Sequence, residues 1–116
     1  MTIDKSAKSG AGGMLITTTE RIPGKEYEVL GIVKGNTIQT KNIGRDFTQG
    51  LKSLVGGELE SYTNMLSDSR RIATERMVKE AEDLGADAIV SVRYSTSSVM
   101  QGAAEMLAFG TAVRYV

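Results

Sequence analysis

Residues 60–90 read ESYTNMLSDSRRIATERMVKEAEDLGADAIV, and this stretch decides the fold because a long helical pattern passes directly into a strand. Its apolar side chains recur at steps of three and four residues, at Tyr62, Met65, Leu66, Ile72, Ala73, Met77, Ala81 and Leu84. That period predicts one amphipathic helix over about residues 60–84, with a single buried stripe. Gly85 then occupies the position where a residue in the left-handed conformation commonly closes a helix.

The outer face of this helix carries charged residues that fall four positions apart. Glu75 with Lys79 and Arg76 with Glu80 are spaced for ion pairs, each of which favours an isolated helix by only about 0.2–0.5 kcal/mol. Packing of the apolar stripe must therefore provide most of the stability of the helix.

The segment after the helix alternates as a half-buried strand does. In residues 88–94 (AIVSVRY), Ala88, Val90, Val92 and Tyr94 share one face, and Ile89, Ser91 and Arg93 share the other. Val99 and Met100 prolong this strand. Residues 106–115 alternate in the same way, so the chain is expected to close with a β-hairpin.

Two further strands are predicted before the helix. Residues 15–19 (LITTT) are β-branched, and a Pro23-Gly24 turn leads to a second strand at residues 27–33. Residues 37–40 either continue that strand or form a brief hairpin partner. Gly31 and Gly35 within it suggest a bulge or a close approach of another backbone. A short capped helix is expected over residues 46–55.

The predicted order of elements is two strands, a short helix, a long helix and two strands, which is typical of an α+β domain. We expect a small antiparallel or mixed β-sheet with the long helix across one face. The other sheet face stays uncovered, and its candidate residues are Ile32, Ile89, Met106 and Ala108. An apolar face of this kind on a chain of this size is typical of an oligomer interface.

The chain of 116 residues fits one domain, which we expect over residues 14–116. Residues 1–13 (MTIDKSAKSGAGG) are interpreted as an expression leader or flexible tail, with a native arm as the alternative. The chain has no cysteine, no signal-peptide pattern and no apolar run long enough to span a membrane, so a cytoplasmic protein is expected.

Charge and composition remove several classes of function. Fourteen basic and fourteen acidic residues cancel, so no net field gathers nucleic acid or anionic lipid. Histidine and cysteine are both absent, and with them the usual parts of nucleophilic triads. No dinucleotide or P-loop motif occurs. We therefore expect no catalytic residues, no cofactor site and no enzymatic activity.

The metal-binding and phosphate-binding patterns are equally weak. Oxygen ligands alone are available, and the group Glu80, Glu82 and Asp83 is interpreted as a solvated acidic surface rather than a metal site. Met65 and Met77 lie on the apolar stripe, which favours core packing over copper coordination. Arg70, Arg71 and Arg76 spread around the helix, and this favours a solvated face or an intersubunit ion pair over a phosphate site.

Several short motifs in fixed order resemble one family. They are Thr17-Thr18, LGIV at 30–33, VGG at 55–57, Tyr62, Arg70, Ala73, Glu75, LGADAIV at 84–90 and GTAV at 110–113. Over residues 14–116 the chain resembles the YbjQ-like family. The resemblance implies a β-α-β-β core related to dodecin-like folds and assembly into a cyclic homo-oligomer, commonly a pentamer. Members are labelled heavy-metal-binding, a label that comes without an established ligand set.

The leading hypothesis is a non-enzymatic homo-oligomeric protein with a binding or interaction role. The resemblance implies that Tyr62, Arg70 and Glu75 lie where subunits of a ring meet or where its channel is lined, and helix packing and ion pairing are their alternative role. A second hypothesis is a metal- or small-molecule-binding module whose sites form at subunit interfaces or on the symmetry axis. A third is an enzyme acting at such interfaces.

Overall fold

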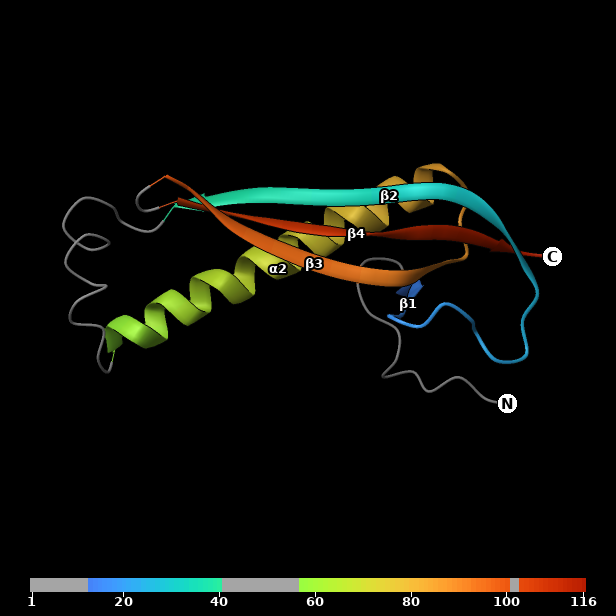
Figure 1. Ribbon diagram of the computed structural model, residues 1–116, viewed down its shortest axis with the longest axis horizontal. Coiled ribbons are helices and arrows are strands. Elements are labelled where there is room, and N and C mark those ends of the chain that lie inside the picture. Colours follow the sequence, from blue (N-terminus) through green and yellow to red (C-terminus); the bar gives the residue numbers. More distant parts are fainter. Residues whose placement is uncertain (1–12, 41–56, 101–102) are drawn as a thin grey trace.

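The computed structural model describes residues 13–40, 57–100 and 103–116, with side chains of the helix from Thr63 onward. Its elements are β1 (Leu15–Ile16), β2 (Tyr27–Thr40), α2 (Gly57–Asp83), β3 (Ala88–Met100) and β4 (Ala103–Tyr115). The sheet order is β1-β3-β4-β2, with β1 parallel to β3 and the other neighbours antiparallel. α2 runs along one face of this sheet (Figure 1). The predicted α+β class, a long helix on a mixed sheet, is confirmed.

The individual elements agree with the sequence except at the first strand. The helix predicted over residues 60–84 is present as α2, and β2 runs unbroken to Thr40, so residues 37–40 continue the strand. The first strand is shorter than predicted. Beyond Ile16 the chain instead bonds to an irregular part of β3, where the Thr17 carbonyl accepts from Val92 N–H at 3.0 Å and the Thr19 carbonyl from Ser91 N–H at 2.9 Å. The helix predicted over residues 46–55 lies outside the described residues.

α2 packs most closely on β2, and a glycine permits this approach. A Cβ placed on Gly35 would lie 2.3 Å from the carbonyl oxygen of Ala73 and 2.3 Å from the backbone nitrogen of Met77. The close backbone approach predicted at Gly31 or Gly35 is therefore confirmed at Gly35, and Gly31 follows a bulge in the pairing of β2 with β4. In the part of the chain that the structure describes, no helix has the length and apolar character that crossing a membrane requires.

Ser91 reverses the alternation of β3. It adopts φ 56°, and the register moves from Val90 opposite Thr111 to Arg93 opposite Phe109, so that β3 contains one residue more than β4 over this interval. A β-bulge of this kind moves the following side chains to the opposite face. Ile89 and Val92 consequently share the helix-side core, whereas Ala88 and Val90 pack on the other side of the sheet.

The prediction for the uncovered face is right at one residue and wrong at three. Ile32 is 78% exposed, but Ile89, Met106 and Ala108 are buried against α2. Ile89 and Val90 point to opposite faces, as neighbours in a strand do, and both are buried because α2 covers one face there and Leu15 and Ile22 cover the other. In β4 the alternation was correct, but the face carrying Met106 and Ala108 is the one that α2 covers.

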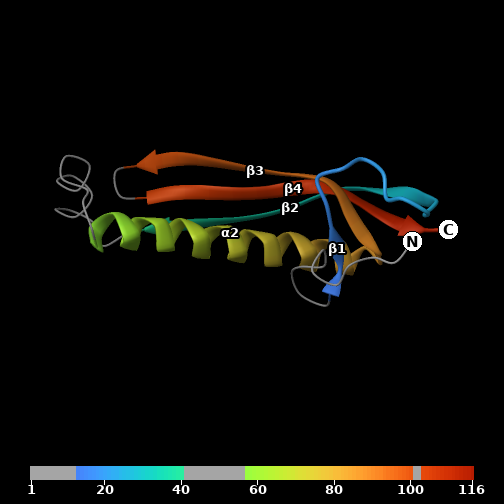
Figure 2. The same cartoon turned by 90° about the horizontal axis from the view of Figure 1, so that it is seen from below.

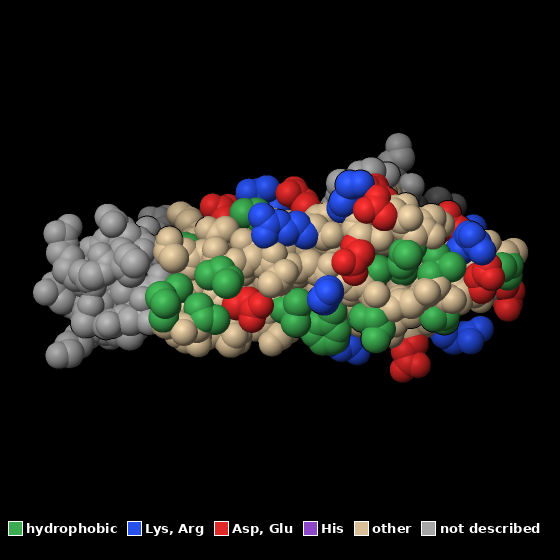
Figure 3. Space-filling model, turned by 90° about the horizontal axis from the view of Figure 1, so that it is seen from above, with side chains coloured by type: hydrophobic (Ala, Val, Ile, Leu, Met, Phe, Trp, Pro, Cys, Tyr) green, Lys and Arg blue, Asp and Glu red, His purple; other side chains and the backbone are tan. Residues whose placement is uncertain are grey.

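The face away from α2 carries apolar side chains among polar ones such as Lys34, Asn36 and Glu105. The register places Val29, Ile32, Ile38, Leu107 and Phe109 on it. Ile32 is 78%, Ile38 57% and Val29 66% exposed, and Phe109 is 36% exposed. Seen from above, where the sheet is uppermost, apolar side chains are spread along the molecule among polar and charged ones (Figure 3). We call these five residues the open apolar face.

One end of the same sheet face is covered by the chain itself. Leu15 and Ile22 pack there on Ala88, Val90 and Val113, with Tyr27 and Tyr115 at the margin. The segment between β1 and β2 thus closes a second, smaller core. The open apolar face begins where this cover ends.

Candidate functional site

A groove of about 470 Å³ lies between α2, β1 and the exposed part of β3. Residues of α2 reach it from successive turns, because positions three and four apart lie on one side of a helix. Its lining consists of Ile16, Ser67, Arg70, Arg71, Thr74, Glu75 and Tyr94. The groove exists because α2 lies alongside β2, while β3 is at the other side of the sheet (Figure 2). Its volume is within the range of small-ligand sites.

Thr74 and Tyr94 connect the two walls of the groove. The Thr74 hydroxyl donates to the carbonyl oxygen of Arg70 at 2.7 Å, so in its contact with Tyr94, at 2.8 Å, the phenol is the donor. Thr74 is buried, whereas Tyr94 is 40% exposed and remains accessible from the groove. The hydrogen bond fixes the phenol ring in front of the helix.

The charged residues leave an excess of positive charge in the groove. Arg71 and Glu75 form an ion pair at 3.4 Å, with side chains 60% and 49% exposed. Exposed pairs of this kind contribute at most about 1 kcal/mol. Arg70 has no ion-pair partner among residues 13–40, 63–100 and 103–116. With two guanidinium groups and one carboxylate, the groove carries one net positive charge.

Two of the three residues that the family resemblance points to meet in this groove. Arg70 and Glu75 both line it. Tyr62 is part of α2, but its side chain lies outside the described residues. Tyr94 and Thr74 were missed as site residues, because the alternation of β3 gave Tyr94 only a place in the sheet and the helical pattern gave Thr74 no role. Their pairing depends on a contact between distant segments.

The groove continues into a second hollow of about 220 Å³ beside β1. Ile16 and Tyr94 line both hollows, and Thr17, Thr18 and Val92 complete the second. Arg93 holds the segment after β1 against β3, since its guanidinium donates to the carbonyl oxygen of Thr18 at 3.1 Å. The two hollows together follow the side of β3.

The ion pairs on α2 differ from those predicted. Lys79 pairs with Asp83 at 2.8 Å, and this contact raises the pKa of Lys79. Arg76 and Glu80 are directed to β2 instead of to each other. The Arg76 guanidinium donates to the carbonyl oxygen of Asn36 at 2.7 Å, and Glu80 Oε1 accepts from the backbone N–H of Lys34 at 2.9 Å.

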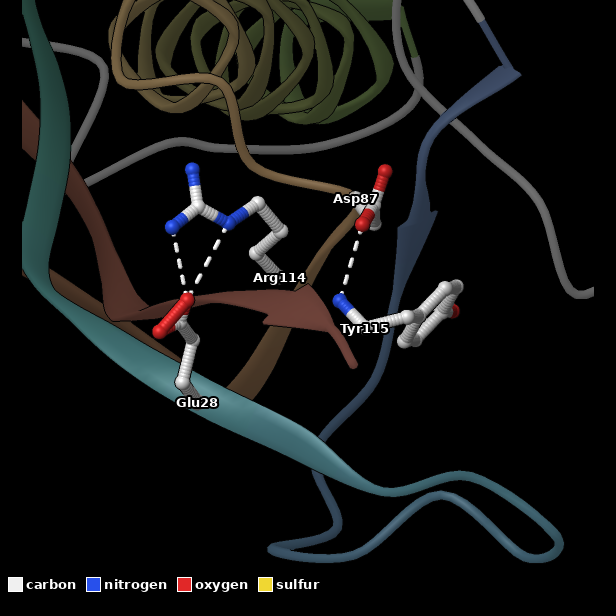
Figure 4. A network of polar contacts seen from close by, with 4 residues as sticks. All are labelled: Glu28, Asp87, Arg114 and Tyr115. Carbon is white, nitrogen blue, oxygen red and sulfur yellow. Dashed lines mark hydrogen bonds and ion pairs between the residues drawn. The ribbon is translucent and has the colours of Figure 1, made fainter.

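A separate polar network holds the other end of the sheet together (Figure 4). Arg114 donates to Glu28 at 2.6 Å across β4 and β2, and this hydrogen bond raises the pKa of Arg114. Asp87 Oδ2 accepts from the backbone N–H of Tyr115 at 2.8 Å. Burial, with a smaller contribution from the charge of Asp87, raises the pKa of Tyr115. The network fixes the ends of β2 and β4.

The chain is a small α+β protein in which two strands, one long helix and two strands follow one another in the described residues. The sequence model of a family described as "Putative heavy-metal-binding" matches residues 14–116. A UPF0145 protein of Methanoculleus marisnigri is 62% identical over 104 residues, covering 89% of this chain and 97% of the relative. A UPF0145 protein of Clostridium novyi is 56% identical over 101 residues, covering 87% and 98%. The chain belongs to this YbjQ-like family, as its motifs predicted.

A solved structure shows the same fold. A protein of unknown function from Pediococcus pentosaceus, of the DUF74 family, has a TM-score of 0.63 at 17% identity, covering 90% of this chain and 99% of its own. At that identity the likeness concerns the fold alone.

The donor set of this chain does not suit the heavy metal in the family description. Thiophilic ions prefer thiolate and imidazole ligands, and the sequence contains neither cysteine nor histidine. Among the described residues, no three Asp or Glu side chains are grouped so as to hold an ion. The described residues of this chain therefore do not fit a heavy-metal site.

Proposed function

We propose that this chain is a homo-oligomeric binding protein without catalytic chemistry of its own, assembled as a ring of five subunits. The open apolar face carries this proposal. It is apolar at five positions, and three of them, Val29, Ile32 and Ile38, are more than half exposed. Fully burying one large apolar side chain contributes about 1.5–3 kcal/mol, so a neighbouring subunit on this face gains several kcal/mol per interface. The family resemblance supports a cyclic pentamer over other assemblies.

The binding role rests on the groove, which places Arg70, Glu75 and Tyr94 in one accessible site. Its polar groups orient a ligand, and the groove supplies no thiol or imidazole for catalysis. Repetition around a ring would provide one such groove per subunit.

Native mass spectrometry and sedimentation over a wide range of protein concentration test the assembly. We expect a pentamer for the wild type and a shift to monomer for Ile32→Asp, because the new charge cannot be buried in an apolar interface. Val116→Asp is the matched control, since Val116 is 79% exposed and Ile32 78%. A wild type that remains monomeric throughout would refute the ring, and equal dissociation by both variants would refute the proposed face.

A metal- or small-molecule-binding module with sites between subunits is the second candidate, and the family description supports it. Around a symmetry axis, one carboxylate per subunit can make an oxygen site that one chain lacks. Glu105 is suited to this, because it points to the open face and accepts from Asn36 Nδ2 at 3.1 Å. Calorimetric titration with zinc, cadmium and calcium tests it. Tight binding that Glu105→Gln abolishes would favour this candidate, and we expect none for zinc or cadmium.

A further inference from the structure

β2 and β3 lie on either side of β4, and their outer edges differ in how their backbone groups are covered. On β2, Lys34 N–H and the Asn36 carbonyl point away from β4, and α2 side chains bond to both: Glu80 to the first and Arg76 to the second. Covering the backbone groups of an edge strand prevents another strand from pairing there. The β2 edge is therefore closed to an incoming strand over this interval.

Over a comparable length, no strand among the described residues pairs with the outer edge of β3 beyond Val92. The backbone N–H of Val92 points away from β4, since it donates to Thr17, and alternation along an antiparallel ladder puts Tyr94, Thr96 and Ser98 on the same outer edge. Within the described residues, β1 is the strand beside β3 and it ends at Ile16, opposite Ile89. From residue 93 to residue 100 every side chain is exposed. Lysine and proline, which commonly protect such edges, are absent from residues 94–100.

The open edge runs beside the groove, and this determines which side chains of an added strand would enter it. Tyr94 is on the helix side of β3, where its hydroxyl meets Thr74. A residue directly opposite Tyr94 on an added strand would point to the same side, because paired residues share a face. It would therefore enter the groove next to Arg70, which has no ion-pair partner in the described part of the chain.

We propose that the β3 edge binds an extended acidic peptide segment of another protein by strand addition, with a Glu or Asp side chain placed in the groove at Arg70. The outward backbone groups of Tyr94, Thr96 and Ser98 pair with the peptide, and main-chain pairing of this type gives affinity while pockets for alternate side chains give specificity. The excess of one positive charge selects a carboxylate. This names the partner class for the binding role proposed above and rests on that role.

A second copy of this chain is a poorer occupant of the same edge. Its β2 edge is covered by Arg76 and Glu80. Its β3 edge, from Tyr94 to Met100, contains no acidic residue that could reach Arg70. The open apolar face, on which the ring depends, is a different surface from the β3 edge.

The test uses the full chain and two short acetylated, amidated peptides, one alternating Glu with Val and one alternating Lys with Val. Binding is followed by fluorescence anisotropy, and hydrogen exchange reports the amides of Tyr94, Thr96 and Ser98. We expect the Glu peptide to bind and to protect these three amides, and the Lys peptide to bind at least about tenfold more weakly, corresponding to one charge-assisted contact. Higher salt should weaken the Glu peptide.

Two pairs of variants separate backbone pairing from charge. Thr96→Pro removes an outward N–H without removing a ladder bond to β4 and should weaken binding about tenfold, whereas the matched Thr96→Val keeps the N–H and should bind as the wild type does. Arg70→Gln should weaken the Glu peptide and Glu75→Gln should tighten it. The Arg70 and Glu75 variants test the charge contribution even if Thr96→Pro perturbs the fold.

Three outcomes would overturn the proposal: equal binding of both peptides, no binding of either, or protection of the three amides in the free protein by a second copy. Native mass spectrometry of the same samples keeps the assembly question separate. A pentamer that does not bind the Glu peptide would refute this partner class but not the proposed ring. A monomer that binds the peptide rejects the ring alone.

Discussion

Replacing Gly35 by alanine should be one of the most damaging single-methyl additions to this protein. The new Cβ would meet backbone atoms of α2 rather than the ends of side chains, at 2.3 Å from the Ala73 oxygen and from the Met77 nitrogen. Backbone within a helix cannot rotate out of the way. The strain is therefore relieved by moving α2 away from β2 as a unit.

The size of this movement gives the expected loss of stability. Ordinary contact begins at 3.4 Å, so the helix must retreat by about 1.1 Å, the difference from 2.3 Å. A gap of about 0.5–1 Å forfeits a quarter to a half of the dispersion attraction. Met77 and Val78 of α2 are fully buried. Burying one such side chain contributes about 1.5–3 kcal/mol. Losing a quarter to a half of the contribution of both residues therefore costs about 1–3 kcal/mol. Overpacked cores lose a similar amount, so we expect about 2–3 kcal/mol.

Urea unfolding at one fixed protein concentration measures this loss, since oligomerisation makes apparent stability concentration-dependent. Gly24→Ala is the matched control. Gly24 has φ +77°, and no atom lies within 4 Å of a Cβ added there. The same methyl group at Gly24 therefore costs only the strain of a left-handed alanine, about 1 kcal/mol. If Gly35→Ala costs no more than Gly24→Ala, the close approach of α2 to β2 is wrong.

Two further predictions concern the bulge at Ser91 and the half-buried phenol of Tyr115. Ser91→Val should lower the free energy of unfolding by about 1–2 kcal/mol, because a β-branched side chain tolerates the left-handed conformation poorly, while Ser91→Asn should be nearly neutral; equal stability of the two variants in urea unfolding would contradict this. For Tyr115, the raised pKa means that the folded state holds the phenol proton more tightly than the unfolded state. Stability should therefore fall as the pH rises above the ordinary pKa of 10.0, and Tyr115→Phe should lessen that fall; identical pH profiles for the variant and the wild type would refute this.

The sequence predicted the elements whose signals are local and repeated. The stripe on α2 recurs over several turns, and Ala73, Met77 and Ala81 are fully buried as the period requires. Leu84 does not follow the stripe and is 47% exposed, since α2 ends at Asp83. A helical period therefore locates the buried face well and its last member poorly.

The burial of β3 was harder to predict because it depends on one backbone conformation. Serine is a common residue in strands and loops, and nothing in AIVSVRY marks Ser91 as left-handed. The irregular register becomes understandable only with the segment that follows β1, since the N–H groups of Ser91 and Val92 donate to the carbonyl oxygens of Thr19 and Thr17 respectively. A non-local pairing thus decides which apolar residues face the helix, and periodicity within a single strand cannot reveal it.

The candidate site was predictable only in its charges. Arg70 and Glu75 were identified through the family resemblance, but their meeting with Tyr94 requires knowing that α2 lies off the centre of the sheet. No spacing in the sequence encodes that displacement directly. The glycine at position 35 was recognised as a place of close approach, although the element that approaches it could not be named from the sequence.

The displacement of α2 toward β2 links the core to the proposed binding edge. Because Gly35 lets the helix backbone lie against β2, Arg76 and Glu80 are near enough to cover the Lys34 N–H and the Asn36 carbonyl on that edge. The same position leaves the helix side of β3 exposed from Tyr94 onward, with Tyr94 beside Arg70. A helix centred on the sheet would leave the β2 edge bare and fill the groove. One small residue in the core thus closes one edge of the sheet and opens the other.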